Sequence, residues 1–294
     1  RTGPTLRAKF SDVLHGLFNL RYANSYADTT KDFNSNRLGA LGSLLYQLDP
    51  ANTLSGSLTA SQTRYIESDS KPFDYDREDA YVGYQRTTPA FSLEAAVGYS
   101  WLNMRHGDSR SGSLLRGSLH WNPSAATSLG VNVDREYSDA AQDLVFTPAQ
   151  LGNVGIGSGI NGAVIAPQVY VENRIGFDIN HRQDTFRLGI APFWRKLDYV
   201  GDPLSDQRSA GYYTSAAYYL RPTFYLDFYA GQERRKYTAI ERTDDDLRYG
   251  ISLNLQRTRH WLWSLLLEHQ RRDSNGVDSS YSENSVMLSI AWRR

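Results

Sequence analysis

The chain has 294 residues and a formal net charge of zero, because 32 basic side chains balance 32 acidic ones. A neutral chain has no overall field that attracts nucleic acid, so the charge argues against nucleic-acid binding. Cysteine is absent, which excludes disulfides, thiolate metal sites and cysteine nucleophiles.

Residue usage favours β-strands, because Tyr (20) and Phe (11) are abundant while Met is rare (2). No apolar run approaches the roughly 18 residues that a membrane-spanning helix needs. The negative mean hydropathy still permits a membrane protein. Strands of a membrane barrel alternate lipid-facing apolar residues with polar residues that face the lumen, so their average looks hydrophilic.

The first residues show no secure strand pattern. We expect residues 1–12 to form a lead-in, a plug or part of another strand, and residues 13–294 to form the main fold. The chain does not open with the charged and apolar stretches of a secretory signal, so we expect a mature protein.

Alternation of apolar and polar side chains then recurs along the chain. It is clear, in chain order, in residues 91–101, 169–180, 186–195, 247–256 and 285–292. In 247–255 every odd position is Leu, Tyr or Ile, whereas the even positions are polar or Gly. This period of two predicts strands with one apolar face. Residues 210–220 carry tyrosines on both faces, so their register stays open.

Short and long connections alternate between these segments. The short ones lie near residues 49–52, 87–89, 122–124, 181–184, 221–223 and 257–259. The longer polar ones lie near 28–34, 68–76, 106–111, 138–167, 199–208, 237–245 and 273–280. Outer-membrane barrels show this asymmetry, with short periplasmic turns and longer extracellular loops.

The pattern predicts an all-β, transmembrane, antiparallel up-and-down barrel in the cell outer membrane. We expect about fourteen strands, with sixteen as the alternative. A soluble β-sandwich or propeller has strands of about five or six residues, which is shorter than the alternation observed here.

Aromatic residues gather near the ends of the expected strands. The tryptophans are Trp101, Trp121, Trp194, Trp261, Trp263 and Trp292. Such rings form the interfacial girdle of a membrane barrel. Tyr225 and Tyr229, on either side of Asp227, could instead form an inward track on which sugar rings stack.

Charged residues on the polar faces are the candidates for a lumenal substrate-binding wall, together with Tyr225, Asp227 and Tyr229. They are Glu94, Arg116, Asp134, Glu172, Arg174, Asp178, Arg187, Arg195, Glu233, Arg235, Arg248 and Glu268. Any charge at this depth must avoid lipid, so these residues equally fit a polar wall that only lines water.

Other motifs carry weaker hypotheses. The glycine-rich connection 138–167 could fold inward as a constriction or remain an outer loop. Asp244, Asp245 and Asp246 could bind calcium, although a solvated loop tip explains them better. The runs 234–236 and 271–272 could contact lipopolysaccharide.

Catalytic and cofactor motifs are weak. His106-Gly107-Asp108-Ser109 and Glu268-His269 contain catalytic residue types, but neighbours in a strand face opposite sides, so Glu268 and His269 cannot pair without a bulge. The run 155–159 lacks the Lys-Ser/Thr pair of a nucleotide loop. We therefore expect no catalytic residue, no metal and no cofactor.

The C-terminal region resembles a known family through several short motifs. They are Glu233-Arg234-Arg235-Lys236-Tyr237, Arg242-x-Asp244-Asp245-Asp246, Arg259-His260-Trp261, Glu268-His269-x-Arg271-Arg272-Asp273-Ser274 and Tyr281-x-Glu283-Asn284. Over residues 165–294 they are similar to the outer-membrane β-barrel porins encoded in bacterial exopolysaccharide operons. One departure is the end of the chain, where Trp292 is followed by Arg293 and Arg294 instead of closing on an aromatic residue.

This resemblance implies a role in moving a secreted or capsular polysaccharide across the outer membrane, alongside periplasmic export components. We expect passive conduction through the polar lumen, with outer-membrane lipid and lipopolysaccharide as further partners. The alternatives are a general or small-solute diffusion porin and an outer-membrane barrel hydrolase.

Overall fold

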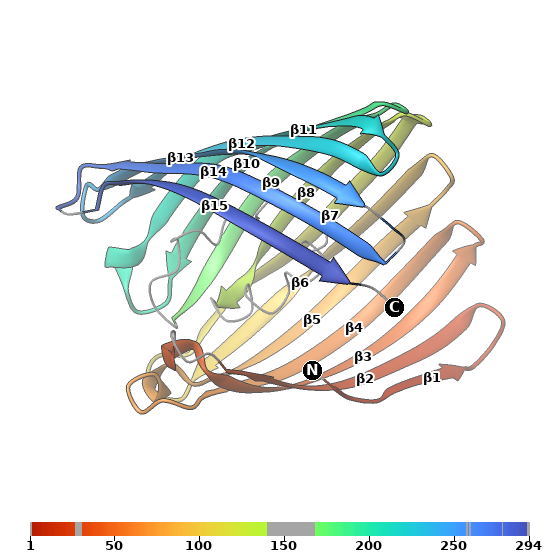
Figure 1. Ribbon diagram of the computed structural model, residues 1–294. Helices are drawn as coiled ribbons and strands as arrows, with labels where there is room; N and C mark the ends of the chain where they lie inside the picture. The colour runs from red at the N-terminus through yellow and green to blue at the C-terminus, as the bar shows by residue number, and fades with distance from the viewer. Residues whose placement is uncertain are drawn as a thin grey trace.

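The structure is a computed structural model, which describes residues 2–26, 31–139, 168–256, 258, 260–277 and 279–292. Its strands form one antiparallel sheet in which every strand pairs with its neighbour in the sequence (Figure 1). The strands are β1 (Thr5–Lys9), β2 (Leu14–Ser25), β3 (Ser35–Asp49), β4 (Asn52–Tyr65), β5 (Tyr75–Thr87), β6 (Phe91–Met104), β7 (Arg110–Ser124), β8 (Thr127–Asp139), β9 (Val169–Arg182), β10 (Phe186–Tyr199), β11 (Gln207–Arg221), β12 (Phe224–Tyr237), β13 (Thr243–Gln256), β14 (Trp261–Ser274) and β15 (Tyr281–Trp292).

In the described parts of the connections, three short 3₁₀ turns are present. They are η1 (Lys31–Phe33), η2 (Lys71–Phe73) and η3 (Pro203–Ser205). Among the residues that the structure describes, no helix has the length and apolar character needed to cross a membrane.

The fold confirms the up-and-down barrel expected from the sequence. The sheet is curled, with the long connections at one end and the short turns at the other (Figure 1). The fifteen strands are one more than the expected fourteen or so, because residues 5–9 pair with β2 as the short edge strand β1. The other edge strand, β15, comes round towards the β1–β2 end of the sheet (Figure 1).

Period-two alternation decides which side chains face outward. Residues paired across strands share a face, so Val97, Leu115 and their outward neighbours form an apolar outer surface. In β11 the outward positions include Tyr212 and Tyr218, which are 41% and 51% exposed, whereas Tyr213 faces inward. The pairing with β10 thus settles the register that the sequence left open.

All six tryptophans lie on the outer surface, between 39% and 54% exposed. Trp101 and Trp194 lie towards the long-loop ends of β6 and β10, whereas the other four lie at the short-turn end of the sheet. The expected aromatic girdle is therefore present at both ends of the apolar belt, as in outer-membrane barrels.

Candidate functional site

The inward face of the sheet carries every residue expected on the lumenal wall. The strand register places them side by side: Arg116 lies opposite Asp134 on the neighbouring strand, and Asp134 lies opposite Arg174 on the next. On β10, β12 and β13, Arg187, Asp227 and Arg248 also face inward, with Arg248 nearer the long loops than the other two. The structure thus places these side chains in the lumen, and whether they bind a substrate remains a proposal.

Aromatic side chains line the inward face of β10–β12. Near the short turns, the rings of Tyr219 and Tyr225 stack with centroids 5.0 Å apart, and the Arg187 guanidinium lies 4.8 Å from the Tyr219 ring centre. Nearer the long loops, Phe193 and Tyr213 stack almost in parallel, 5.5 Å apart. The wall therefore presents ring pairs at two levels along the barrel.

Polar side chains occupy the levels between these ring pairs. Asp227 accepts a hydrogen bond of 2.8 Å from the Asn254 amide. One level higher, Glu268 accepts hydrogen bonds from the Tyr229 hydroxyl and, at 2.6 Å, from Arg248 Nε. Rings and hydrogen-bonding groups thus follow each other from the short-turn end towards the long-loop end.

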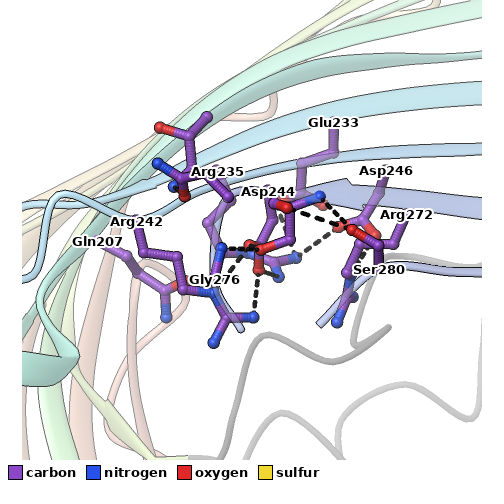
Figure 2. A network of polar contacts seen from close by, with 12 residues as sticks. Gln207, Glu233, Arg235, Arg242, Asp244, Asp246, Arg272, Gly276 and Ser280 are labelled. Carbon is purple, nitrogen blue, oxygen red and sulfur yellow. Dashed lines mark hydrogen bonds and ion pairs between the residues drawn. The ribbon is translucent and has the colours of Figure 1, made fainter. Parts of the chain in front are cut away.

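A network of charges surrounds Arg235 at the long-loop end of this wall (Figure 2). The Arg235 side chain is fully buried and lies 3.5 Å from both Glu233 and Asp246. Asp246 also accepts a 2.6 Å hydrogen bond from Arg272. Since a buried charge is costly unless it is paired, the network explains how these residues tolerate burial.

The network corrects the interpretation of the three consecutive aspartates as a solvated loop tip or a calcium site. They belong to strand β13, where Asp244 and Asp246 face inward and Asp245 faces outward. Arg242 donates two 2.8 Å hydrogen bonds to Asp244, which raises the pKa of Arg242, and Arg234 binds Asp245 at 2.6 Å. Among the described residues, no three His, Cys, Asp or Glu side chains form a metal-binding group.

The second feature of the lumen is the long-loop end of β8, which leaves the wall. The β7–β8 ladder stops at the pair Leu115–Arg135, although β7 continues to Arg110 and β8 to Asp139. Asp139 nevertheless contacts Arg37 of β3, five strands away. At about 4.8 Å per strand, that separation is about 24 Å along the wall, too far for two side chains to span. The end of β8 must therefore lean across the lumen.

The contacts of Asp139 hold this end in place. The carboxylate, which is fully buried, lies 2.6 Å from Arg37 Nη2 and accepts hydrogen bonds from the hydroxyls of Tyr75, at 2.5 Å, and Tyr65, at 3.5 Å. We call these four residues the Asp139 cluster. Nearby, Arg77 donates hydrogen bonds to the Tyr137 carbonyl and, at 3.3 Å, to Glu136.

Apolar packing reinforces the polar contacts. Tyr75, Leu102, Tyr137 and Val169 form a buried cluster between the end of the β8–β9 hairpin and the wall strands β5 and β6. The lumen is therefore narrowed by an element of the barrel itself. Of the connection 138–167, for which a constriction or an outer loop was expected, residues 138 and 139 belong to β8, and 140–167 lie outside the described residues.

Sequence reasoning missed Arg37, Arg77, Glu136 and Asp139. The alternation of β3 and β5 could have identified Arg37 and Arg77 as lumenal residues. For Asp139 no such signal exists, because alternation along β8 predicts that its side chain faces outward. It faces inward only because the end of β8 bends.

The remaining candidate residues do not come together as a site. Glu268 faces inward, whereas His269 faces outward, where its Nδ1 lies 2.8 Å from Asn284 Oδ1. Within the run 234–236 only Arg235 faces inward, and within 271–272 only Arg272 does. The pair Glu268–His269 therefore cannot act as a catalytic dyad, and the two basic runs are split between lumen and outer surface.

Comparison with known proteins shows the fold. The structure resembles the copper transporter OprC, with a TM-score of 0.57, 14% identity and coverage of 98% of this chain and 58% of that one. It also resembles a variant of the ferric enterobactin receptor PfeA from Pseudomonas aeruginosa, with a TM-score of 0.53, 10% identity and coverage of 92% and 50%. The chain thus spans about half the length of these two proteins. The structural resemblance, together with the apolar belt and the aromatic girdles, decides the class. The chain is an outer-membrane β-barrel.

A bacterial polysaccharide outer membrane secretin matches with 11% identity over 95% of this chain and 84% of that one, but its TM-score of 0.44 is too low to bear on function. No family model and no curated protein matches the sequence.

Proposed function

We propose that this barrel is an outer-membrane pore that exports a secreted or capsular polysaccharide by passive conduction. The observation that carries the proposal is the series of ring pairs and hydrogen-bonding groups along the inward face of β10–β14. A sugar ring has apolar faces that stack on tyrosine and a rim of hydroxyls that exchange hydrogen bonds with carboxylates, amides and guanidinium groups.

The vertical spacing of these groups supports conduction of a chain over capture of a single sugar. Arg187, Tyr219 and Tyr225 lie at the short-turn end, Tyr229 and Glu268 lie in the middle, and Phe193 and Tyr213 lie nearer the long loops. A polymer could exchange one contact for the next without losing all of them at once. Resemblance of residues 165–294 to porins of exopolysaccharide operons points to the same substrate class.

Replacing Tyr219, Tyr225 and Tyr229 together by alanine should reduce the amount of surface polysaccharide severalfold, because each lost stacking surface removes about 1 kcal/mol of contact. The measurement is quantification of surface polysaccharide in a deletion strain complemented with each variant. Barrel assembly is checked by heat-modifiable migration on gels.

The chain offers a matched control for this experiment. Tyr212 and Tyr218 lie in β11 next to lumenal positions but face lipid. Their double alanine variant should secrete at the native level. Undiminished polysaccharide in the lumenal variant would contradict export through this track. Large, permanently open conductance of the purified native protein would favour the small-solute porin instead.

A further inference from the structure

The departure of β8 from the wall leaves a cavity at the long-loop rim of the barrel. The cavity has a volume of about 550 Å³. Its sides are the first residues of β7, starting at Arg110, and the end of β10 with residues 198–203; its floor is the recessed segment 135–137 of β8. We call this space the outer cavity.

Two arginines dominate the charge of the outer cavity. Its acidic residues, Glu136 and Asp198, are each neutralised by a cation that does not line it: Arg116 lies 2.5 Å from Glu136, and Lys196 lies 2.7 Å from Asp198. Among the described residues, Arg110 and Arg135 form no ion pair. Within the described part of the chain, the cavity therefore presents positive charge that no carboxylate pairs.

Arg135 is held in a fixed position across the opening. Its Nε donates a 3.0 Å hydrogen bond to the Ser113 hydroxyl on β7, and its Nη1 donates one of 2.5 Å to Asn173 on β9. A planar guanidinium matches the geometry of phosphate oxygens, and the hydroxyls of Ser111 and Ser113 add further donors beside it.

The level of the cavity relative to the apolar belt identifies the source of such a phosphate. Arg135 pairs with Leu115, and the next outward pair below it is Val133–Ile175; Leu115 and Ile175 are 38% and 39% exposed. A ligand in the cavity would thus lie directly above hydrocarbon-facing positions. The long loops mark the extracellular side of the barrel, where the outer leaflet lies.

We propose that the outer cavity binds the phosphorylated sugar headgroup of an outer-leaflet glycolipid. Arg110 and Arg135 bind the phosphate, the serine hydroxyls contact the sugar, and the acyl chains extend over the apolar belt below. This inference does not depend on polysaccharide export, because it concerns the outside of the wall.

The test is native mass spectrometry of the full, detergent-purified chain with lipid A as the probe. Native protein should retain lipid A, and the variant Arg110→Gln with Arg135→Gln should bind at least about tenfold more weakly. Lysine at both positions keeps the charge but loses the planar donor geometry, so its binding should lie between that of the native protein and that of the glutamine variant.

A matched control removes the same charge elsewhere at the rim. Arg105 and Arg208 are exposed, lie at the long-loop end and do not line the cavity. Their double glutamine variant should bind like the native protein.

Three results would overturn the proposal. One is equal lipid A binding by the Arg110/Arg135 glutamine variant, and another is equal binding of lipid A whose phosphates have been removed. The third is displacement of lipid A by a similar concentration of glucosamine 1-phosphate, which would assign the cavity to a soluble phosphosugar.

Discussion

Asp139→Asn should increase the ion conductance of the protein in planar bilayers and lower its free energy of unfolding by about 3 kcal/mol. The native carboxylate is fully buried against Arg37 and two tyrosine hydroxyls. Asparagine has nearly the same shape but no charge, so the Arg37 guanidinium loses its counter-charge. The end of β8 then loses its ion pair with β3 but keeps the Arg77 hydrogen bonds and the apolar packing, so its attachment to the wall is weakened and the lumen widens.

Two further variants separate release of the hairpin from general destabilisation. Asp134→Asn changes another lumenal carboxylate of β8, five residues before the Asp139 cluster, and should leave the conductance unchanged. Leucine at both Arg37 and Asp139 removes the two charges together, so stability should recover while the conductance stays high. Native conductance in both Asp139 variants would show that the contact does not control the width of the pore.

Phe177→Arg should destabilise the barrel by about 2–4 kcal/mol, because it places a charge on the surface that faces hydrocarbon. Phe177 is 45% exposed and lies between Ile175 and Ile179 on the outer face of β9, within the apolar belt. Equilibrium urea unfolding from phospholipid vesicles measures the loss.

The adjacent residue provides the control for lipid contact. Gly176 faces the lumen, and a Cβ placed on it would meet no atom within 4 Å. Gly176→Arg should therefore change the unfolding free energy by much less than Phe177→Arg. Equal losses at the two positions would contradict the assignment of the two faces of β9.

Local alternation was sufficient to predict most of this protein. Odd and even positions in 247–256 separate apolar from polar side chains, so they indicate both the strand and its lipid-facing side. The same rule places Glu94, Arg187 and Glu268 in the lumen. These features follow from period two within a single strand, and they need no knowledge of distant parts of the chain.

Contacts between neighbouring strands decided the side-chain orientations and strand limits that alternation left open. In residues 210–220 tyrosines occur at both parities, and only hydrogen bonding to β10 and β12 establishes that Tyr212 faces out and Tyr213 faces in. The aspartates at 244–246 look like a loop in sequence because Asp is depleted in strands. Arginines on β12 and β14 and in the preceding loop neutralise them and allow the strand to extend.

The sequence by itself determined the barrel, its two faces and the alternation of short and long connections. Each of these follows from residues close together in the chain and from whether their side chains face lipid or water. Only the tertiary structure determined the bend of β8, the Asp139 cluster and the outer cavity. They depend on contacts between residues as far apart as Arg37 and Asp139, and on where a ladder of hydrogen bonds stops. No local periodicity encodes those long-range pairings, which arise when the sheet curls and brings distant strands to face each other across the lumen.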